Sequence, residues 1–399
     1  MSDAAEAILD AAGRNVIAVG FHATTVDAVA RDAGVSRATV YRVFPGGRAD
    51  ILDGFLAREV ERFFSDLYDH VRDLDDLESV LVEGLTYARS RIIAHPVLNV
   101  ALVEDSSVLE STFSKTIESI TATIAEFVTS YLPTSPHRAE RGDFLARMAL
   151  SYLSAPGAWD FADPAQVEAL VRSELIPSVS SGKRVSKVRP TPLPKAENTT
   201  LQQRVARALQ KEFVSGHSLS MESVARSAEV SRATLYRAFP GGRWQLVGAT
   251  VEIETARILS AVAAGLNDAR SLDDAVVGAL TTIWHHAATH PSLNRLLDVR
   301  PDLIHDQMRF AKAQRNFEVF TAQMAPLLAR WVGREASERV AEWTLRVMFS
   351  YWLDPAPSLD VTDPASIASF YNRHLAAGVD ALAALPDQRR AVAVLGKRH

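Results

Sequence analysis

The feature of this sequence that most constrains its fold is an internal repeat at an offset of 195 residues. Residues 29–48 read VARDAGVSRATVYRVFPGGR and residues 224–243 read VARSAEVSRATLYRAFPGGR, which are identical at 16 of 20 positions. The same offset carries His95 onto His290, and after a small insertion Tyr152 corresponds to Tyr351. A repeat unit of about half the chain indicates duplicated domains and not a solenoid. Since 399 residues exceed what one hydrophobic core normally serves, we expect two similar halves.

Composition narrows the class of function. The formal net charge is -5, so any contact with nucleic acid must come from local clusters of Arg and Lys. Cysteine is absent, which excludes disulfides, thiolate metal sites and thiol nucleophiles and fits a reducing compartment. The first residues, MSDAAEAILDAAG, lack the pattern of a signal peptide, and no apolar run approaches the roughly 20 residues that cross a bilayer. We therefore expect a cytoplasmic protein with no membrane contact and no cofactor.

Hydrophobic periodicity predicts an all-α fold. Segments such as DILDGFLAREVERFFSDLYDHV and SERVAEWTLRVMFSYWL place apolar residues at three- and four-residue spacing, whereas strand-like alternation is hardly visible. Between the halves, residues 177–200 are rich in Pro, Ser and basic residues and show no helical period, which predicts an exposed, partly extended tether. The tether could also touch a DNA backbone through its five basic residues, which are Lys183, Arg184, Lys187, Arg189 and Lys195.

Two short helices joined by a tight turn are predicted near the start of each half. Thr25 precedes an apolar-periodic stretch and can cap a helix by accepting an orphan backbone N–H. Gly34 suits the left-handed conformation of the turn that follows, and Ser36 can cap a second helix over residues 37–43. This arrangement is a helix-turn-helix unit, whose second helix enters the major groove of DNA.

The second helix of each unit carries side chains suited to DNA. From Val35 to Arg48 there are three arginines and no acid, and arginines without an acidic partner on an exposed helix serve no core purpose. Arg37 can form a bidentate pair with guanine, and Ala38 can approach a thymine methyl. Tyr41, Arg42 and Arg48 are placed for phosphate oxygens. The residues expected on the outer, DNA-facing surface are Ser36, Arg37, Ala38, Thr39, Tyr41 and Arg42, with Ser231, Arg232, Ala233, Thr234, Tyr236 and Arg237 in the second half.

The segments SRATVYRVFPGGR and SRATLYRAFPGGR resemble the recognition-helix region of tetracycline-repressor-type (TetR) regulators. The resemblance implies a small DNA-binding bundle followed by a larger helical domain that binds an inducer and dimerises through its last two helices. The DNA contacts it implies are Thr25, Ser36, Arg37, Ala38, Tyr41 and Arg48, and Ser220, Ser231, Arg232, Ala233, Tyr236 and Arg243.

Two departures from the family pattern stand out. This chain carries two such units where a family member usually carries one. Glu229 replaces Gly34 at the second turn, where a non-glycine residue is strained if φ is positive. The expected domains are a helix-turn-helix domain at 1–58, a regulatory domain at 59–178, a linker at 179–198, a second helix-turn-helix domain at 199–250, a second regulatory domain at 251–385 and a tail at 386–399.

These features predict a one-component repressor in which two recognition helices of one chain act as a pseudo-dimer. The helices near 138–178 and 335–382 would form its four-helix interface, with apolar area from Tyr152, Trp159, Trp343, Phe349, Tyr351 and Trp352. The recognition helices differ only at Val40/Leu235 and Val43/Ala238, both expected to point inward, so the operator should be nearly palindromic. A homodimer with four DNA-binding units, an activator, and a scaffold without DNA binding remain open, whereas no catalytic motif indicates an enzyme.

An inducer would bind among the helices of each regulatory domain, and its chemical identity cannot be read from the sequence. His286 and His290 stand one helical turn apart, but no third ligand is evident and His290 precedes Pro291, so no metal site is expected. The candidate ligand-binding residues mix aromatic and polar character and are Tyr87, His95, Phe113, Trp284, His286, His290, Met308 and Phe317.

Overall fold

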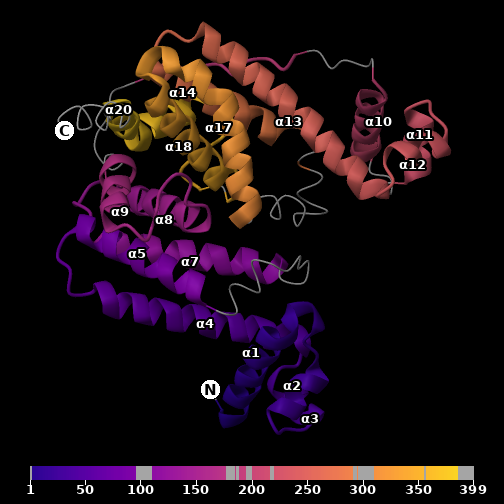
Figure 1. Ribbon diagram of the computed structural model, residues 1–399, viewed down its shortest axis with the longest axis vertical. Helices are drawn as coiled ribbons and strands as arrows, with labels where there is room; N and C mark the ends of the chain where they lie inside the picture. The colour runs from indigo at the N-terminus through magenta and orange to yellow at the C-terminus, as the bar shows by residue number, and fades with distance from the viewer. Residues whose placement is uncertain are drawn as a thin grey trace, which may run out of the picture. The chain divides into compact units, whose positions relative to one another are not determined.

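The computed structural model describes residues 2–95, 110–176, 185, 188–194, 200–215, 220–290, 294, 310–354 and 356–384, and within these ranges every regular element is helical (Figure 1). The expected all-α class is therefore confirmed for this part of the chain. The chain divides into two compact units, the first ending at Ile176 and the second beginning at Pro177, with α17 divided between them at Arg315. Phe113 and Met308 lie outside the described side chains, as do Lys183, Arg184, Lys187 and Lys195.

The first unit begins with a four-helix cluster and continues into a helical body. In the cluster, α1 packs against α2, α3 and the start of α4, and in the body α5 packs against α4, α8 and α9 while α7 lies along α8. The elements are α1 (Asp3–Ala23), α2 (Val26–Asp32), α3 (Arg37–Val43), α4 (Arg48–Val71), α5 (Leu77–Ala94), α7 (Glu110–Ser130), α8 (Arg138–Ser154) and α9 (Pro164–Leu170), which continues into a π-helical turn at Val171–Leu175.

The second unit follows the same order. Here α10 packs against α11 and α13, and α14 packs against α13, α18 and α19. The elements are α10 (Leu201–Ser215), α11 (Met221–Ser227), α12 (Arg232–Ala238), α13 (Gly242–Asp268), α14 (Leu272–Thr289), α17 (Phe310–Val332), α18 (Arg334–Leu353), α19 (Pro364–Phe370), a π-helical turn at Tyr371–Leu375 and α20 (Ala376–Ala384). The bounds of α11, α12 and α14 are those of α2, α3 and α5 shifted by the 195 residues of the sequence repeat.

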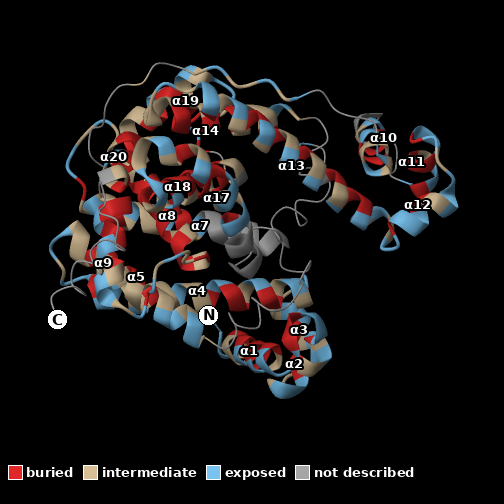
Figure 2. Ribbon diagram, turned by 45° about the horizontal axis from the view of Figure 1, so that its top comes forward, coloured by how far each residue is buried: buried red, intermediate tan, exposed pale blue. Residues whose placement is uncertain are grey.

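Each helix-turn-helix cluster has its own apolar core. In the first, Ile8, Phe21, Val40 and Phe55 come together from α1, α3 and α4. In the second, Leu209, Val224, Leu235 and Phe239 occupy comparable places. Figure 2 shows these buried positions gathered on the facing sides of the helices. Since burial of each such side chain contributes about 1.5–3 kcal/mol, these cores fix how α3 and α12 are presented.

One long helix leads from each cluster into its body. α4 extends past the expected domain border at residue 58, and α13 extends past the expected border at residue 250 (Figure 1). A hydrogen-bonded helix transmits a displacement along its length, so the recognition helices are mechanically connected to the bodies. Within the described residues, no helix combines the length and the apolar character that a membrane crossing requires.

Several aromatic residues expected at a pseudo-dimer interface are buried or hydrogen-bonded within the chain. Tyr152, Trp343 and Tyr351 are buried, and the indole N–H of Trp159 donates to Oε1 of Glu174 at 3.1 Å. The interface itself stays a prediction.

Residues 188–194 of the expected tether are exposed or half-buried, and they also contact the second unit. Thr191 makes hydrogen bonds to Thr282 and His286 of α14, and the carbonyl of Pro194 accepts from Arg257 of α13. Of the basic residues assigned to the tether, Arg189 is described and exposed. The sequence correctly predicted that residues 188–194 form no helix. It did not indicate that they contact α13 and α14.

The turn between α11 and α12 contains the one non-glycine residue with positive φ among the described residues, Glu229 at φ 56°. Its counterpart Gly34 has φ 69°. The strain expected from the sequence is therefore present, because a β-carbon makes the left-handed region unfavourable by about 1–2 kcal/mol.

We expect Glu229→Gly to stabilise the second unit by about 1 kcal/mol, since relief of left-handed strain outweighs the greater flexibility of glycine in the unfolded chain. Denaturant unfolding followed by circular dichroism measures the change. Glu229→Ala is the control, because it removes the carboxylate and keeps the β-carbon. Equal effects of Gly and Ala would show that the carboxylate, and not the backbone, is responsible.

Candidate nucleic-acid interface

Side-chain caps fix the first helix-turn-helix. The hydroxyl of Thr25 accepts the amide of Ala28 at 3.2 Å and so caps α2. The hydroxyl of Ser36 accepts the amide of Thr39 at 3.1 Å and caps α3. Each cap satisfies an orphan N–H that the first turn of a helix leaves unpaired. The caps predicted from the sequence are confirmed.

The second helix-turn-helix repeats this geometry. Ser220 accepts the amide of Ser223 at 3.0 Å, and Ser231 accepts the amide of Thr234 at 3.0 Å. In both units the capping hydroxyl also contacts a neighbouring hydroxyl, at 2.9 Å for Ser36 with Thr39 and 2.8 Å for Ser231 with Thr234. Two separate segments of the chain therefore start their recognition helices with the same local structure.

The same side chains are exposed on α3 and α12. Tyr41 and Tyr236 are each 44% exposed, a high value for a large ring on a short helix. The expected outer-face residues are exposed or half-buried in both units, which are Thr25, Ser36, Arg37, Ala38, Thr39, Tyr41 and Arg42, and Ser220, Ser231, Arg232, Ala233, Thr234, Tyr236 and Arg237. Val40 and Leu235 are buried beneath them as predicted, but Ala238 is exposed and not inward.

The expectation that the recognition arginines have no acidic partner is wrong. Nε of Arg37 lies 3.0 Å from Oδ1 of Asp27, and Arg232 lies 3.7 Å from the carboxylate of Glu222 at the corresponding position. The stretch from Val35 to Arg48 contains no acid, but these two acids stand on the preceding helix. With 61% of the Arg37 side chain and 56% of the Asp27 side chain exposed, such a pair contributes at most about 1 kcal/mol, so a guanine or phosphate can replace the carboxylate.

Arg48 contacts the protein itself. Its Nε donates to the carbonyl of Thr24 at 2.7 Å, and its Nη2 donates to the carbonyl of Phe21 at 2.6 Å. These bonds satisfy carbonyls at the end of α1 and fasten it to the start of α4. Its counterpart Arg243 is exposed. The structure thus gives Arg48 a structural role that the phosphate assignment did not include.

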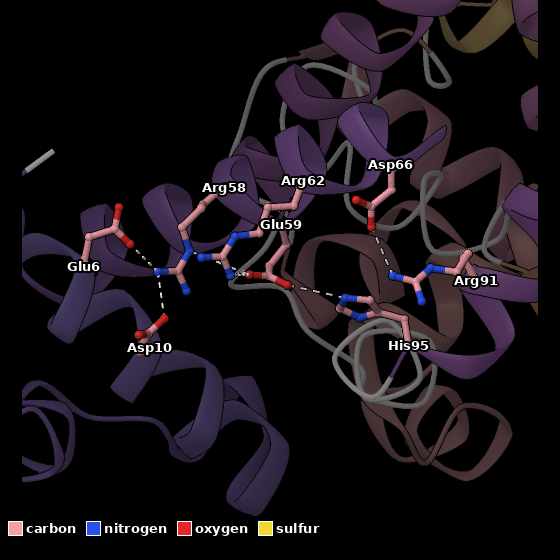
Figure 3. A network of polar contacts seen from close by, with 8 residues as sticks. All are labelled: Glu6, Asp10, Arg58, Glu59, Arg62, Asp66, Arg91 and His95. Carbon is pink, nitrogen blue, oxygen red and sulfur yellow. Dashed lines mark hydrogen bonds and ion pairs between the residues drawn. The ribbon is translucent and has the colours of Figure 1, made fainter. Parts of the chain in front are cut away.

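An ion pair between glutamate and histidine recurs where each long helix meets the next one. Oε2 of Glu59 lies 3.4 Å from Nε2 of His95, as Figure 3 shows, and Oε2 of Glu254 lies 3.2 Å from Nε2 of His290. Arg257 also pairs with Glu254, at 2.7 Å. These glutamates are not among the site residues expected from the sequence, although their separation of 195 residues, the offset of the repeat, marks them as equivalent.

The environment of Glu254 favours its charged form. Burial of Glu254 raises its pKa, but the hydrogen bond from His290 and the charge of Arg257 outweigh burial, and the pKa falls below its usual 4.5. A lowered folded-state pKa contributes stability above pH 4.5 that is lost as the pH falls through the folded value.

We therefore expect Glu254→Gln to reduce stability at neutral pH and to have a diminishing effect as the pH falls below 4.5. Denaturant unfolding of both proteins between neutral and acid pH measures the difference. Glu252→Gln, at an exposed position on the same helix, is the control. A difference that stays constant with pH would contradict the assignment.

The expected ligand-binding residues that the structure describes each contact a different protein group. Tyr87 stacks on His70 with ring centroids 4.5 Å apart, the indole of buried Trp284 donates to the carbonyl of Met348 at 3.0 Å, and the guanidinium of Arg346 lies 4.7 Å from the ring centroid of Phe317. His95 and His290 form the ion pairs above, and His286 contacts Thr191. Their assignment to a ligand site stays a prediction.

Comparison with known proteins agrees with the geometry of the first cluster. Residues 8–53 match the family model described as "Bacterial regulatory proteins, tetR family". An uncharacterized HTH-type transcriptional regulator of Mycobacterium tuberculosis, found in strains CDC 1551 and H37Rv, is 27% identical over 178 residues, which are 44% of this chain and 86% of the relative. The fatty acid degradation regulator FadR of Bacillus halodurans aligns with a TM-score of 0.33 and 17% identity, over 43% of this chain and 95% of that one.

α1–α4 form a helix-turn-helix cluster with an exposed, capped second helix, which is the arrangement that places a helix in the major groove of DNA. Over residues 8–53 the chain is similar to bacterial regulatory proteins of the tetR family.

Proposed function

We propose that this chain is a transcriptional repressor that binds double-stranded DNA with two recognition helices, α3 and α12, supplied by one molecule. The observation that carries the proposal is the repetition of one exposed set of side chains on two helices with the same caps and the same kind of ion pair. The repeated core and helix bounds support two complete DNA-binding units. The exposed residues of α3 recur in α12, and the remaining differences are half-buried Val43 against exposed Ala238 and Thr25 against Ser220, so we expect two nearly identical half-sites.

One chain acting on two half-sites has a physical advantage. Helix-turn-helix pairs need recognition helices about 34–36 Å apart to reach successive major grooves. When both units belong to one chain, the second binds at an effective concentration near the millimolar range. Occupancy of the operator then rises in proportion to the protein concentration, and not to its square as for two chains that must first associate.

Selection from a random pool of double-stranded DNA tests the proposal. We expect enrichment of two half-sites about one helical turn apart, or a multiple of it. Arg37→Ala and Arg232→Ala should relax base preference in different half-sites. Failure to enrich any sequence would exclude sequence-specific binding.

Light scattering of the complex determines the assembly. One chain of 43.6 kDa per DNA duplex is the expected result. Two chains per duplex would show that four DNA-binding units act together, and would replace the pseudo-dimer with a homodimer.

The resemblance to TetR-type regulators supports a response to a small-molecule inducer of unidentified chemistry. α4 and α13 each run from a DNA-binding cluster into a body, so a ligand that shifts a body can change the separation of the recognition helices. Release of the selected DNA on addition of a candidate compound would identify the inducer.

A further inference from the structure

Residues 188–194, called the strap below, lie against α13 and α14 of the second unit. Between Pro190 and Pro192, Thr191 donates its amide to Oγ1 of Thr282 at 3.0 Å, and its carbonyl accepts from Nε2 of His286 at 2.7 Å. A few residues upstream, the side-chain amide of Asn372 bonds both backbone groups of Val185, at 2.6 Å to its N–H and 3.1 Å to its carbonyl. At Val185 and again at Thr191, both the backbone N–H and the backbone carbonyl are therefore hydrogen-bonded to the second unit.

The sequence of the strap, VRPTPLP, suits this position. Alternating prolines restrict the backbone to extended conformations and carry no N–H that would need a partner. A segment that is already extended when free loses little entropy when it binds, which is why proline-rich peptides are common ligands of protein grooves.

Two glycines make room for the strap. A β-carbon at Gly265 on α13 would overlap Oγ1 of Thr191, so another residue there would require the Thr191 hydroxyl to shift. A β-carbon at Gly278 on α14 would be in van der Waals contact with Cγ1 of Val188 at 3.5 Å, so a long side chain directed at the strap would displace it.

Large side chains fill the corresponding surface of the first unit. His70 and Glu83, which stand 195 residues before these glycines, form an ion pair at 3.5 Å. Tyr87, at the position of Thr282, stacks on His70, and Arg91, at the position of His286, pairs with Asp66 at 3.3 Å (Figure 3). The first unit therefore has paired side chains at these positions of α4 and α5, whereas the second has two glycines where the strap lies against α13 and α14. The surface of α13 and α14 that the strap covers is called the groove below.

We propose that this groove is a peptide-binding site for the chain's own linker, and that the bound strap fixes α13 to α14 and so holds the second DNA-binding cluster in one position relative to its body. The corresponding helices of the first unit, α4 and α5, are joined by direct ion pairs between their own side chains. The two halves would then differ in function, because only in the second unit would the position of the cluster depend on whether the linker is bound. This role in regulation rests on the proposed function, whereas the binding of the strap does not.

The contacts beyond the strap support this coupling. Nη2 of Arg257 donates to the carbonyl of Pro194 at 2.9 Å, and Nη1 of the same guanidinium pairs with Glu254, which pairs in turn with His290 at the end of α14. Trp352 of α18 packs against the apolar core of the second DNA-binding cluster. The long helix α13 is therefore fastened to the strap, to α14 and to the body.

Thiol labelling tests the binding of the strap directly, since the chain has no cysteine. Val188→Cys places a thiol against the groove, and Arg189→Cys places one on the exposed side of the same segment. We expect Cys at 188 to react with a maleimide roughly tenfold or more slowly than Cys at 189. Equal rates would show that the strap is not bound and would overturn the proposal.

Introducing the residues of the first unit should close the groove. In the double variant Gly265→His, Gly278→Glu we expect the thiol at 188 to react about as fast as the thiol at 189. Helix propensity favours both changes over glycine, so the unit should remain folded. Gly248→His, at an open position on α13, is the matched control and should leave the rates unchanged. Amide exchange is a second measurement. In the double variant without any added cysteine, the amide of Thr191 should exchange faster than in the original chain.

Spin-label distances test the consequence for the DNA-binding cluster. Labels at exposed Arg226 and Glu338 report on the second unit, and labels at Arg31 and Ala139 report on the corresponding positions of the first. We expect the distance distribution of the second unit to broaden when the groove is closed, and that of the first unit to stay the same. An unchanged width in the second unit of the double variant would contradict the role of the strap. Thiol labelling and spin-label distances are both measured without DNA. A protein that fails to bind DNA can therefore still confirm or contradict this inference.

Discussion

Replacing Arg37 and Arg232 together by alanine is expected to weaken binding to the selected operator by about 2–6 kcal/mol, since each bidentate contact with guanine is worth about 1–3 kcal/mol. The two effects should add because the arginines are in separate units and pair with different acids, Asp27 and Glu222. Fluorescence anisotropy at one fixed salt concentration measures the loss.

Arg14→Ala provides a matched control for the loss of charge. Arg14 pairs with Asp32 at 2.9 Å and is 58% exposed, close to the values for Arg37, but it stands on α1 and not on a recognition helix. We expect it to change affinity by less than about 1 kcal/mol. If the control and the double variant weakened binding equally, general charge and not groove contact would explain the affinity.

Replacing Arg48 by alanine is expected to destabilise the first unit by about 1.5–3 kcal/mol, because the hydrogen bonds to the carbonyls of Thr24 and Phe21 are made by a charged donor. Without them the end of α1 loses two hydrogen bonds to α4, although the carbonyl of Phe21 still accepts the amide of Thr24. Denaturant unfolding measures the loss, and amide exchange in the last turn of α1 locates it.

Arg243→Ala is the comparison, since this counterpart is exposed, and we expect it to cost less stability than Arg48→Ala. Arg48→Lys should restore stability only in part because an ammonium group cannot reproduce the forked geometry. The salt dependence of DNA binding distinguishes the roles. A direct phosphate contact would reduce the salt slope by about one unit, whereas a structural Arg48 leaves the slope unchanged.

Local structure around the recognition helices followed closely from the sequence. The caps at Thr25 and Ser36, the left-handed turn at Gly34 and the strain at Glu229 each depend on a few neighbouring residues. Short-range patterns of this kind are visible in a sequence because the atoms that interact are close along the chain. The repeat extended the same predictions to the second unit.

Contacts between distant residues could not be predicted in this way. Arg48 binds carbonyls 24 and 27 residues earlier in the chain, and nothing in its neighbourhood marks that contact. Asp27 reaches Arg37 only because α2 packs beside α3. A side chain on the surface of a helix is an interaction site or a structural element according to what the fold places opposite it.

The sequence by itself determined the helical class, the positions of the capped recognition helices and the repetition of their exposed side chains, because periodicity and capping are local properties. Only the tertiary structure decided which arginines face acids or carbonyls and where the linker lies. The strap shows the reason most plainly, since Gly265 and Gly278 look like unremarkable helix positions until α13 and α14 are side by side and the missing side chains form a groove.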